Sequence, residues 1–226
     1  MWNIEDIIKA TSGKTNLKNL EINSVSIDSR TIIEGALFIA LKGDNFDGAD
    51  YVNDAIAKGA VAVITSSKKR GNKEILVDDT YQALLDIANF ARKRTSAKII
   101  GVTGSVGKTG TKDAIKTALK ASGKVYATKG NLNNHIGLPL SLANMPRDTD
   151  FGVFELGMNH AGEISFLTKI AQPDIAIITT VEAVHLEFFK DVAGIADAKA
   201  EIMEGLSKNG TIILNHDNTY YKRLKN

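Results

Sequence analysis

The chain has 226 residues, of which 43% are hydrophobic and 24% are charged, and its formal net charge is +2. It holds no cysteine, which excludes disulfides and thiolate metal sites. The near-neutral charge gives no global reason to expect nucleic acid or an anionic membrane as a partner. No apolar run approaches the roughly 20 residues that a membrane helix needs, and the polar N-terminus lacks a signal-peptide pattern. We therefore expect a soluble, cytoplasmic protein with one large domain or two modest ones.

Residues 1–79 have the pattern of a small α/β domain. Short apolar or β-branched runs bounded by turn residues predict strands at residues 25–27, 36–40, 61–64 and 75–77, with a short helix at 51–58. From residue 80 to residue 94 the apolar side chains recur at helical spacing. We expect this helix to form a linker over residues 80–96 between two domains.

Residues 97–226 alternate longer strands with helices. Strands are predicted at residues 99–103, 151–156, 174–180 and 211–215, and helices at 108–121, 163–170 and 195–206. Such alternation predicts a mainly parallel sheet, here of four strands, that is covered on both faces and binds ligands at the carboxyl ends of its strands. Because the chain ends soon after the last of these strands, we interpret this second domain as truncated.

The segment Thr103-Gly-Ser-Val-Gly-Lys-Thr stands between an apolar strand and a long helical pattern. Gly104 and Gly107 allow a tight turn whose N–H groups can point at phosphate oxygens, Lys108 adds a cation, and the Thr109 hydroxyl can bind Mg²⁺. The strict phosphate-loop template would have glycine at Val102, and the alternative is a glycine-rich surface turn with an incidental lysine. The order of strand, turn and helix favours a phosphate cradle.

Two further groups of polar residues follow predicted strands or loops. Asn131, Asn133 and Asn134 lie in a loop before a helical pattern, where asparagine either makes Asx turns and caps or recognises a ligand. Glu155 ends an apolar strand, which suits a Mg²⁺ ligand, although a surface position would explain it equally well. From their residue types alone, His185 is expected to be a capping or core histidine and Lys199 a solvated lysine.

Several motifs together resemble the Mur ligases, which are ATP-dependent enzymes that form amide bonds in peptidoglycan synthesis. Five motifs of this chain resemble the central domain of that family: Thr103-Gly-Ser-Val-Gly-Lys-Thr, Asn131-Leu-Asn-Asn-His-Ile-Gly-Leu-Pro, Glu155-Leu-Gly-Met-Asn-His-Ala-Gly-Glu-Ile, His185-Leu-Glu-Phe-Phe and Ala198-Lys-Ala-Glu-Ile. Three further motifs resemble the N-terminal domain of the family, which binds the UDP-sugar end of the substrate. They are Ser26-Ile-Asp-Ser-Arg, Gly35-Ala-Leu-Phe-Ile-Ala-Leu-Lys-Gly and Asp47-Gly. Two of the motifs are most similar to those of the member that adds D-alanyl-D-alanine to UDP-N-acetylmuramoyl-tripeptide through an acyl phosphate.

The resemblance implies a role for each matched residue. Lys108 would contact the β- and γ-phosphates of ATP, Thr109 and Glu155 would serve Mg²⁺, His185 would bind a second Mg²⁺, and Lys199 would be a carbamoylated metal ligand. Nucleotide contacts are further implied for Gly104, Ser105, Gly107 and Asn134. Substrate contacts are implied for Ser29, Arg30, Asp47, Asn131 and Asn133, where an arginine suits the diphosphate because its guanidinium can bind oxygens in pairs.

The sequence departs from the family pattern at Gly110, Thr180 and the Phe189-Lys-Asp segment, and no counterpart of the family's third, amine-binding domain is apparent. We therefore expect this chain alone to bind ATP and the UDP-linked substrate without completing ligation. Two other readings stay open at this point. One is a generic P-loop ATPase or kinase, and the other is a truncated, non-catalytic binding module.

Overall fold

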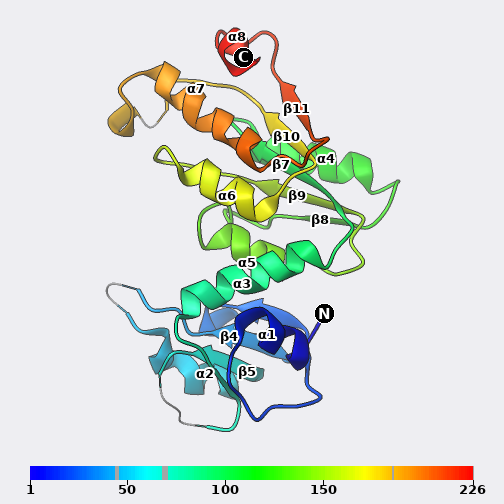
Figure 1. The fold of residues 1–226 in the computed structure, drawn as a ribbon, viewed down its shortest axis with the longest axis vertical. Coiled ribbons are helices and arrows are strands. Elements are labelled where there is room, and N and C mark those ends of the chain that lie inside the picture. The colour runs from blue at the N-terminus through cyan, green and yellow to red at the C-terminus, as the bar shows by residue number, and fades with distance from the viewer. Residues whose placement is uncertain (44–45, 68–70, 185, 226) are drawn as a thin grey trace. The chain divides into compact units, whose positions relative to one another are not determined.

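A computed structural model of the chain describes residues 1–43, 46–67, 71–184 and 186–225. The chain divides into two compact units, Met1–Ala91 and Arg92–Asn226. Figure 1 labels their helices and strands. The expectation of a mixed α/β protein with mainly parallel sheets is confirmed, because each unit is built around a parallel sheet. Within the described residues, no helix is long and apolar enough to cross a membrane.

The first unit holds a parallel sheet in the order β3-β4-β5-β6. The four strands are β3 (Ser24–Ser26), β4 (Ala36–Ile39), β5 (Ala60–Thr65) and β6 (Glu74–Leu76). The short 3₁₀ helices η1 (Ser29–Thr31) and η2 (Gly48–Tyr51) and the helix α2 (Val52–Ala57) connect them. Val52 and Ile56 of α2 pack on a buried cluster that includes Phe38 of β4 and Val63 of β5. This packing holds α2 against the sheet.

The N-terminus adds elements that the sequence patterns did not predict. β1 (Trp2–Asn3) pairs in antiparallel fashion with β2 (Glu21–Ile22), and α1 (Ile4–Thr11) follows directly. The Asn3 side chain caps α1 by accepting a 2.7 Å hydrogen bond from the N–H of Asp6, while Ile4 and Ile7 are buried. The predicted helix over residues 80–94 is present as α3 (Thr80–Lys93), which buries Leu84, Ile87, Ala88 and Ala91 along one face.

The second unit holds a five-stranded parallel sheet in the order β11-β10-β7-β9-β8. Its strands are β7 (Lys98–Thr103), β8 (Val125–Ala127), β9 (Phe151–Glu155), β10 (Ile175–Ile178) and β11 (Thr211–Leu214). The predicted four strands are all found. The expected number was wrong by one, because the three-residue edge strand β8 is too short to leave a clear pattern in the sequence.

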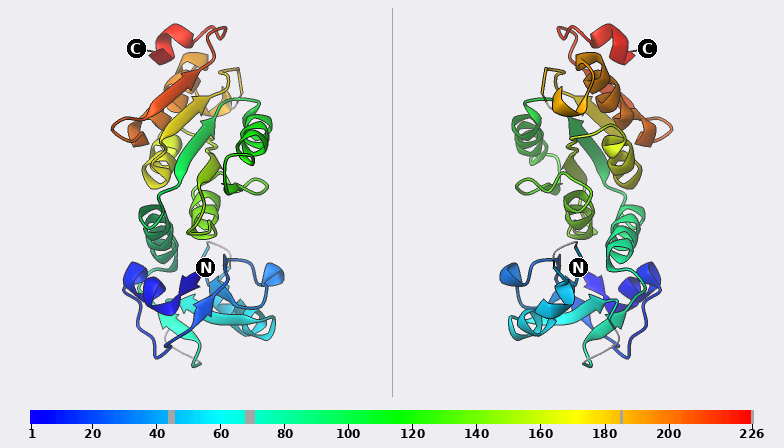
Figure 2. Two further views of the ribbon diagram at one scale, coloured as in Figure 1. Left: turned by 90° about the vertical axis from the view of Figure 1, so that its right-hand side faces the viewer. Right: turned by 90° about the vertical axis from the view of Figure 1, so that its left-hand side faces the viewer.

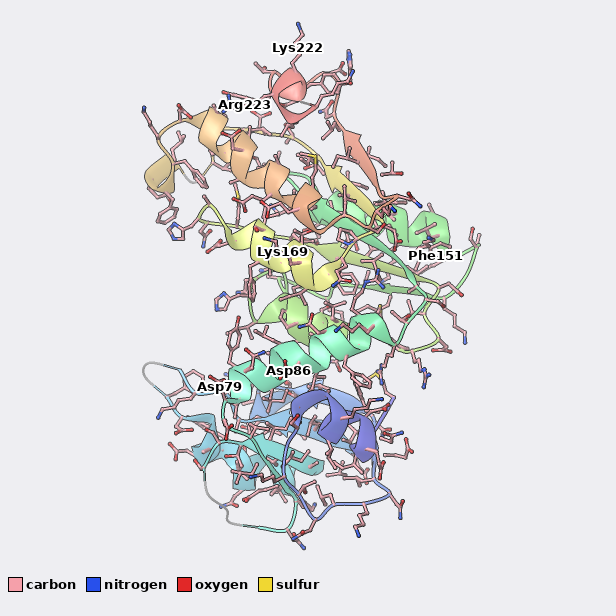
Figure 3. All side chains as sticks on the ribbon, in the orientation of Figure 1. Asp79, Asp86, Phe151, Lys169, Lys222 and Arg223 are labelled. Carbon is pink, nitrogen blue, oxygen red and sulfur yellow. The ribbon has the colours of Figure 1, made fainter. Side chains whose placement is uncertain are left out.

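Helices cover both faces of this sheet (Figure 2). On one face, Ile115 and Leu119 of α4 (Lys108–Leu119) pack on Ile100, Val102 and Val153. The other helices are α5 (Gly137–Ala143), α6 (Glu163–Ala171), α7 (Val192–Ala200), η3 (Leu186–Phe188), η4 (Glu201–Gly205) and α8 (Tyr221–Lys225). The single helix predicted over residues 195–206 is thus the α-helix α7 followed by the 3₁₀ helix η4. The last helix, α8, is tied to α7 by an ion pair at 2.6 Å between Arg223, labelled in Figure 3, and Asp197.

Candidate functional site

The loop between β7 and α4 has the backbone conformation of an anion cradle. Gly104 and Gly107 have φ angles of +149° and +85°, which favour glycine. A Cβ atom on Gly104 would also collide with the side-chain oxygen of Thr179. The Thr179 hydroxyl lies there because it donates a 2.6 Å hydrogen bond to the carbonyl of Val106. Both glycines are therefore required by the shape of the loop.

The N–H groups at the start of α4 are available to a ligand. Within the described residues, no protein group accepts a hydrogen bond from the backbone N–H of Gly107, Lys108 or Thr109. By contrast, the N–H of Ser105 is used within the protein, since it donates to the carbonyl of Thr180 at 2.9 Å. The open N–H groups and the positive end of the α4 dipole form a site that favours anionic oxygens.

The side chain of Lys108 lies across this loop. Its Nζ donates a 2.7 Å hydrogen bond to the carbonyl of Gly104. Burial lowers the pKa of Lys108, while the negative charge of Glu155 opposes that shift. The ammonium group is thus held against the Gly104 carbonyl, within the loop.

Glu155 joins the cradle at the carboxyl end of β9. Its side chain is only 3% exposed, so the surface alternative for this residue is wrong. Thr109 Oγ1 donates to Glu155 Oε2 at 3.2 Å, and Lys112 Nζ lies 3.4 Å from Glu155 Oε1. Oε1 is buried and accepts no hydrogen bond from the described residues.

These oxygens fit a magnesium ion chemically. A carboxylate and a hydroxyl are hard oxygen ligands. Glu155 Oε1 forms an ion pair with Lys112 at 3.4 Å but accepts no hydrogen bond from the described residues, so it keeps lone pairs that a metal ion can use. In the described part of the chain, no group of three or more His, Cys, Asp or Glu side chains is gathered to hold a metal. The donor set therefore suits Mg²⁺ bound through one or two protein ligands together with phosphate oxygens, rather than a cage made by the protein alone.

Lys199 is a buried amine near the same edge of the sheet. It lies in α7 and is 2% exposed, so the expectation of a solvated lysine is wrong. No acceptor among the described residues forms a hydrogen bond or ion pair with its Nζ. Burial, helped by the positive charge of Lys108, lowers the pKa of Lys199 to about 8. A substantial fraction of this amine is therefore neutral and nucleophilic in mildly alkaline solution.

The position of α7 is fixed by the residue that follows it. Both carboxylate oxygens of Glu201 cap the start of α6, accepting from the N–H of Gly162 at 2.7 Å and of Ser165 at 3.0 Å. His185, which the motif resemblance assigns to a second metal, lies outside the described residues.

The asparagine loop packs against the segment that follows Glu155. Asn134 Oδ1 accepts from the N–H of Gly137 at 2.8 Å, so Asn134 caps the start of α5. The Asn133 carbonyl accepts from the N–H of Gly157 at 2.8 Å, and Asn131 is exposed. The capping alternative thus accounts for Asn134 in the structure, while the side chains of Asn131 and Asn133 make no such cap.

The substrate residues predicted from the N-terminal motifs all lie in the first unit. Arg30 is on the surface and forms a two-point pair with Asp28, through Nε to Oδ1 at 2.9 Å and Nη2 to Oδ2 at 2.7 Å. This pairing holds the pKa of Asp28 at about 2. Ser29 is buried, and Asp47 caps η2 by accepting from the N–H of Ala49 at 2.9 Å. Arg30 could exchange Asp28 for another two-oxygen anion of similar shape.

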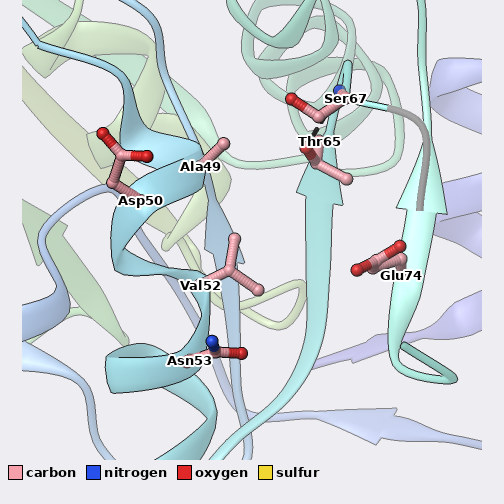
Figure 4. Close-up of a pocket in the computed structure, with 7 residues that line it drawn as sticks. All are labelled: Ala49, Asp50, Val52, Asn53, Thr65, Ser67 and Glu74. Atoms are coloured by element: carbon pink, nitrogen blue, oxygen red, sulfur yellow. Dashed lines mark hydrogen bonds between the residues drawn. The ribbon is translucent and has the colours of Figure 1, made fainter. Parts of the chain in front are cut away.

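A pocket of about 150 Å³ lies beside this region and was not predicted (Figure 4). It is formed between η2, α2 and the ends of β5 and β6, and its lining residues are Ala49, Asp50, Val52, Asn53, Thr65, Ser67 and Glu74. Ser67 N–H donates to Thr65 Oγ1 at 3.1 Å. The lining is mostly polar, and it includes none of the substrate residues predicted from the sequence.

The sequence analysis also missed Lys112 and Thr128. Lys112 Nζ donates to the carbonyl of Thr128 at 3.2 Å, and the N–H of Glu155 donates to Thr128 Oγ1 at 3.3 Å. A signal for Lys112 was present, because residues four apart share a helix face and Lys112 follows Lys108 by four. Thr128 follows the unpredicted strand β8, so no pattern placed it beside Glu155.

Known families match both units. The family described as Mur ligase middle domain matches residues 102–226, and the one described as Mur ligase family, catalytic domain, matches residues 21–92. The match over both units sets aside a generic P-loop ATPase or kinase.

Curated relatives at high similarity share one name, UDP-N-acetylmuramoyl-tripeptide–D-alanyl-D-alanine ligase. The relative in Rickettsia prowazekii is 44% identical over 99% of this chain and 50% of its own length. The relative in Bacillus subtilis is 40% identical over 93% of this chain and 47% of its own length. The chain thus spans about half the length of the curated relatives it matches.

Solved structures agree with this similarity. A crystal structure of MurF from Acinetobacter baumannii matches with a TM-score of 0.89 at 32% identity, covering 99% of this chain and 51% of the other. MurF ligase from Thermotoga maritima in complex with ADP matches with a TM-score of 0.77 at 34% identity, covering 92% and 48%. Because the middle-domain match alone covers more than half of the chain and the loop, sheet and buried carboxylate agree with it, this chain belongs to the Mur ligase family.

Proposed function

We propose that the second unit binds ATP with Mg²⁺ at the carboxyl edge of its sheet. The observation that carries this proposal is the contact between the phosphate cradle and a buried carboxylate, in which Thr109 Oγ1 lies 3.2 Å from Glu155 Oε2. The open N–H groups of Gly107, Lys108 and Thr109 provide donors for phosphate oxygens. The ADP bound to the related Thermotoga maritima structure supports the same ligand class for this chain.

Each residue of the site then has a distinct task. Lys108 offsets negative charge on the β- and γ-phosphates, as the lysine of a phosphate loop does. Thr109 and Glu155 supply oxygen ligands for Mg²⁺. Gly104, Ser105 and Gly107 shape the cradle and hold it to the segment after β10. Asn134 contributes by fixing the nearby asparagine loop through its cap of α5.

Lys199 is proposed to act as a metal ligand after its neutral amine adds to carbon dioxide and releases one proton to solvent, which leaves a carbamate anion. The buried position and the pKa of about 8 support this assignment, since only the neutral amine reacts. The carbamate would replace a buried positive charge with a negative one beside Lys108. We expect ¹³C-labelled bicarbonate to give a carbamate NMR signal in the wild-type chain and none in Lys199→Ala; the same signal in both would reject the assignment. The metal role of His185 rests on its motif alone.

We propose that the first unit binds the UDP end of the substrate through Ser29, Arg30 and Asp47. Arg30 already holds a carboxylate with two parallel hydrogen bonds, which is the geometry that a diphosphate also accepts. Asn131 and Asn133 are assigned to the substrate in the second unit, because their side-chain amides are not consumed by a helix cap.

For the whole protein, the proposed reaction is amide-bond formation between D-alanyl-D-alanine and UDP-N-acetylmuramoyl-tripeptide. The relatives' shared name supports these substrates. Transfer of the γ-phosphoryl group from ATP to the peptide carboxylate would give an acyl phosphate and ADP. Attack by the amine of D-alanyl-D-alanine would then form the amide bond, with phosphate as the leaving group and loss of the amine's proton. The residues of this chain position the phosphates and offset their charge, and such positioning is the main contribution of a protein to phosphoryl transfer. We also propose a cytoplasmic location, because the proposed reaction consumes ATP.

Calorimetric titration of this polypeptide tests the proposal. We expect separate binding of UDP-N-acetylmuramoyl-tripeptide and of a non-hydrolysable ATP analogue, with the second affinity rising when Mg²⁺ is added. Absence of both binding events would contradict the proposal and leave a non-catalytic module as the explanation. Binding of the nucleotide alone would limit the proposal to the second unit.

A further inference from the structure

Lys112 is a buried lysine in α4 whose ammonium group contacts three acceptors. Its Nζ lies 3.4 Å from Glu155 Oε1, 3.2 Å from the carbonyl oxygen of Thr128 and 3.3 Å from Asp113 Oδ1. The Lys112 side chain is 7% exposed and that of Glu155 is 3% exposed, whereas Asp113 is largely in solvent. Glu155 is therefore the buried charge that balances Lys112.

The carboxylate of Glu155 is held from two sides by one helix. Thr109 approaches Oε2, and Lys112, three residues later on the same face of α4, approaches Oε1. Thr128 completes the arrangement because it binds both partners, accepting from Lys112 Nζ through its carbonyl and from the N–H of Glu155 through its hydroxyl. Lys112 and Thr128, which do not themselves line the cradle, thus set the orientation of the carboxylate together with Thr109, which does.

We propose that Lys112 is a positioning residue that holds Glu155 in the orientation needed for Mg²⁺ bound together with the nucleotide. This inference rests on the proposed nucleotide function of the second unit. Lys112 acts through Glu155, whereas contact with the phosphates is the role proposed for Lys108, one helical turn earlier. Residues that orient a metal ligand typically contribute about 10- to 100-fold to metal affinity.

The test is the gain in ADP affinity that Mg²⁺ produces, measured by calorimetry with and without the metal. Four proteins are compared: the wild type, Lys112→Met, Glu155→Gln and the double variant. We expect Lys112→Met to lose about tenfold or more of the Mg²⁺-dependent gain while its affinity for metal-free ADP changes little. We expect the double variant to match Glu155→Gln, because a residue that acts only through Glu155 has no further effect once Glu155 cannot bind the metal.

Lys116→Met is the matched control, because Lys116 lies one turn further along α4 and its side chain makes no ion pair or hydrogen bond with the described residues. It should keep the full gain. A gain retained by Lys112→Met, or effects of the two single substitutions that simply add, would overturn the inference while leaving the nucleotide site in place. Failure of the wild type to bind ADP would instead reject the proposed function, and the inference with it.

Thermal unfolding first establishes that each variant is folded. If Lys112→Met is unfolded, Lys112→Gln takes its place, because glutamine can still donate to the Thr128 carbonyl while removing the charge that faces Glu155. The same loss of the Mg²⁺-dependent gain is expected, and the same retained gain would overturn the inference.

Discussion

Charged candidate residues are held differently in the two units. In the first unit, the side chain of Arg30 is 85% exposed and already paired with Asp28, its neighbour two residues away. In the second unit, Lys112, Glu155 and Lys199 are buried, and the contacts of Lys112 and Glu155 join elements far apart in the sequence. A surface pair can exchange one partner for a ligand at little cost, whereas buried charges depend on the fold around them. Substitutions should therefore affect mainly ligand binding in the first unit, with at most a small effect on stability, and both binding and stability in the second.

The largest expected effect is that of Gly104→Ala in the second unit. Alanine at a φ of +149° is strained, and its Cβ would meet the Thr179 hydroxyl. We expect the free energy of unfolding to fall by up to about 3 kcal/mol and ADP binding to be lost. Urea unfolding and calorimetry measure the two effects; unchanged stability would show that the loop does not need this conformation.

The next largest effect is expected for Lys108→Ala, and it is an effect on nucleotide binding. Removing a charged hydrogen-bond donor at the phosphates should weaken ADP binding by on the order of 1.5–3 kcal/mol. The affinity for UDP-N-acetylmuramoyl-tripeptide should stay unchanged in a direct titration. Arg30→Ala is the matched control from the first unit and should show the reverse pattern; equal losses for both ligands in either variant would remove the distinction between the units.

Gly110→Ala should stabilise the second unit. Gly110 lies in the first turn of α4, and a Cβ there would have nothing within 4 Å. Alanine favours a helix over glycine by about 1 kcal/mol, so the free energy of unfolding should rise by up to that amount. Urea unfolding of this variant beside Gly104→Ala compares two glycines six residues apart. A destabilised Gly110→Ala would mean that this position needs glycine for a reason that the packing does not show.

The smallest expected effect concerns the pH dependence of the first unit. The pKa of Asp28 is lowered from 3.8 to about 2 by its hydrogen bonds with Arg30. Because the folded-state pKa is below that of the unfolded chain, the pair contributes stability above about pH 4 that is lost as the pH falls towards 2. The pair lies at the surface, so the contribution is a few tenths of a kcal/mol. Between about pH 5 and pH 3, the free energy of unfolding measured with urea should fall less steeply in Asp28→Asn than in the wild type. The same pH dependence in both proteins would contradict this role of the pair.

The parts of the fold with long, regular patterns could be predicted from the sequence. Residues 99–103 and 151–156 gave the strands β7 and β9 because they are apolar runs in the core, and the carboxyl-end rule brought Thr109 and Glu155 to one edge. The strand β8 was missed, since three residues are too few for a pattern. The helix α5 was indicated only as a helical pattern after the asparagine loop, without bounds, because it is short and contains Pro139. The burial of Lys199 could not be predicted from its helix alone, because it depends on how the neighbouring elements pack around α7.

Amide NMR of the polypeptide tests the central claim most directly. The claim is that the second unit binds nucleotide at the open N–H groups that begin α4 and that the first unit binds the UDP-linked substrate near Arg30. Addition of ADP with Mg²⁺ should shift the amide signals of Gly107, Lys108 and Thr109 and leave those of Ser29 and Arg30 in place, while UDP-N-acetylmuramoyl-tripeptide should shift the latter pair. Shifts from ADP that avoid residues 107–109, or that appear equally in both units, would contradict the account.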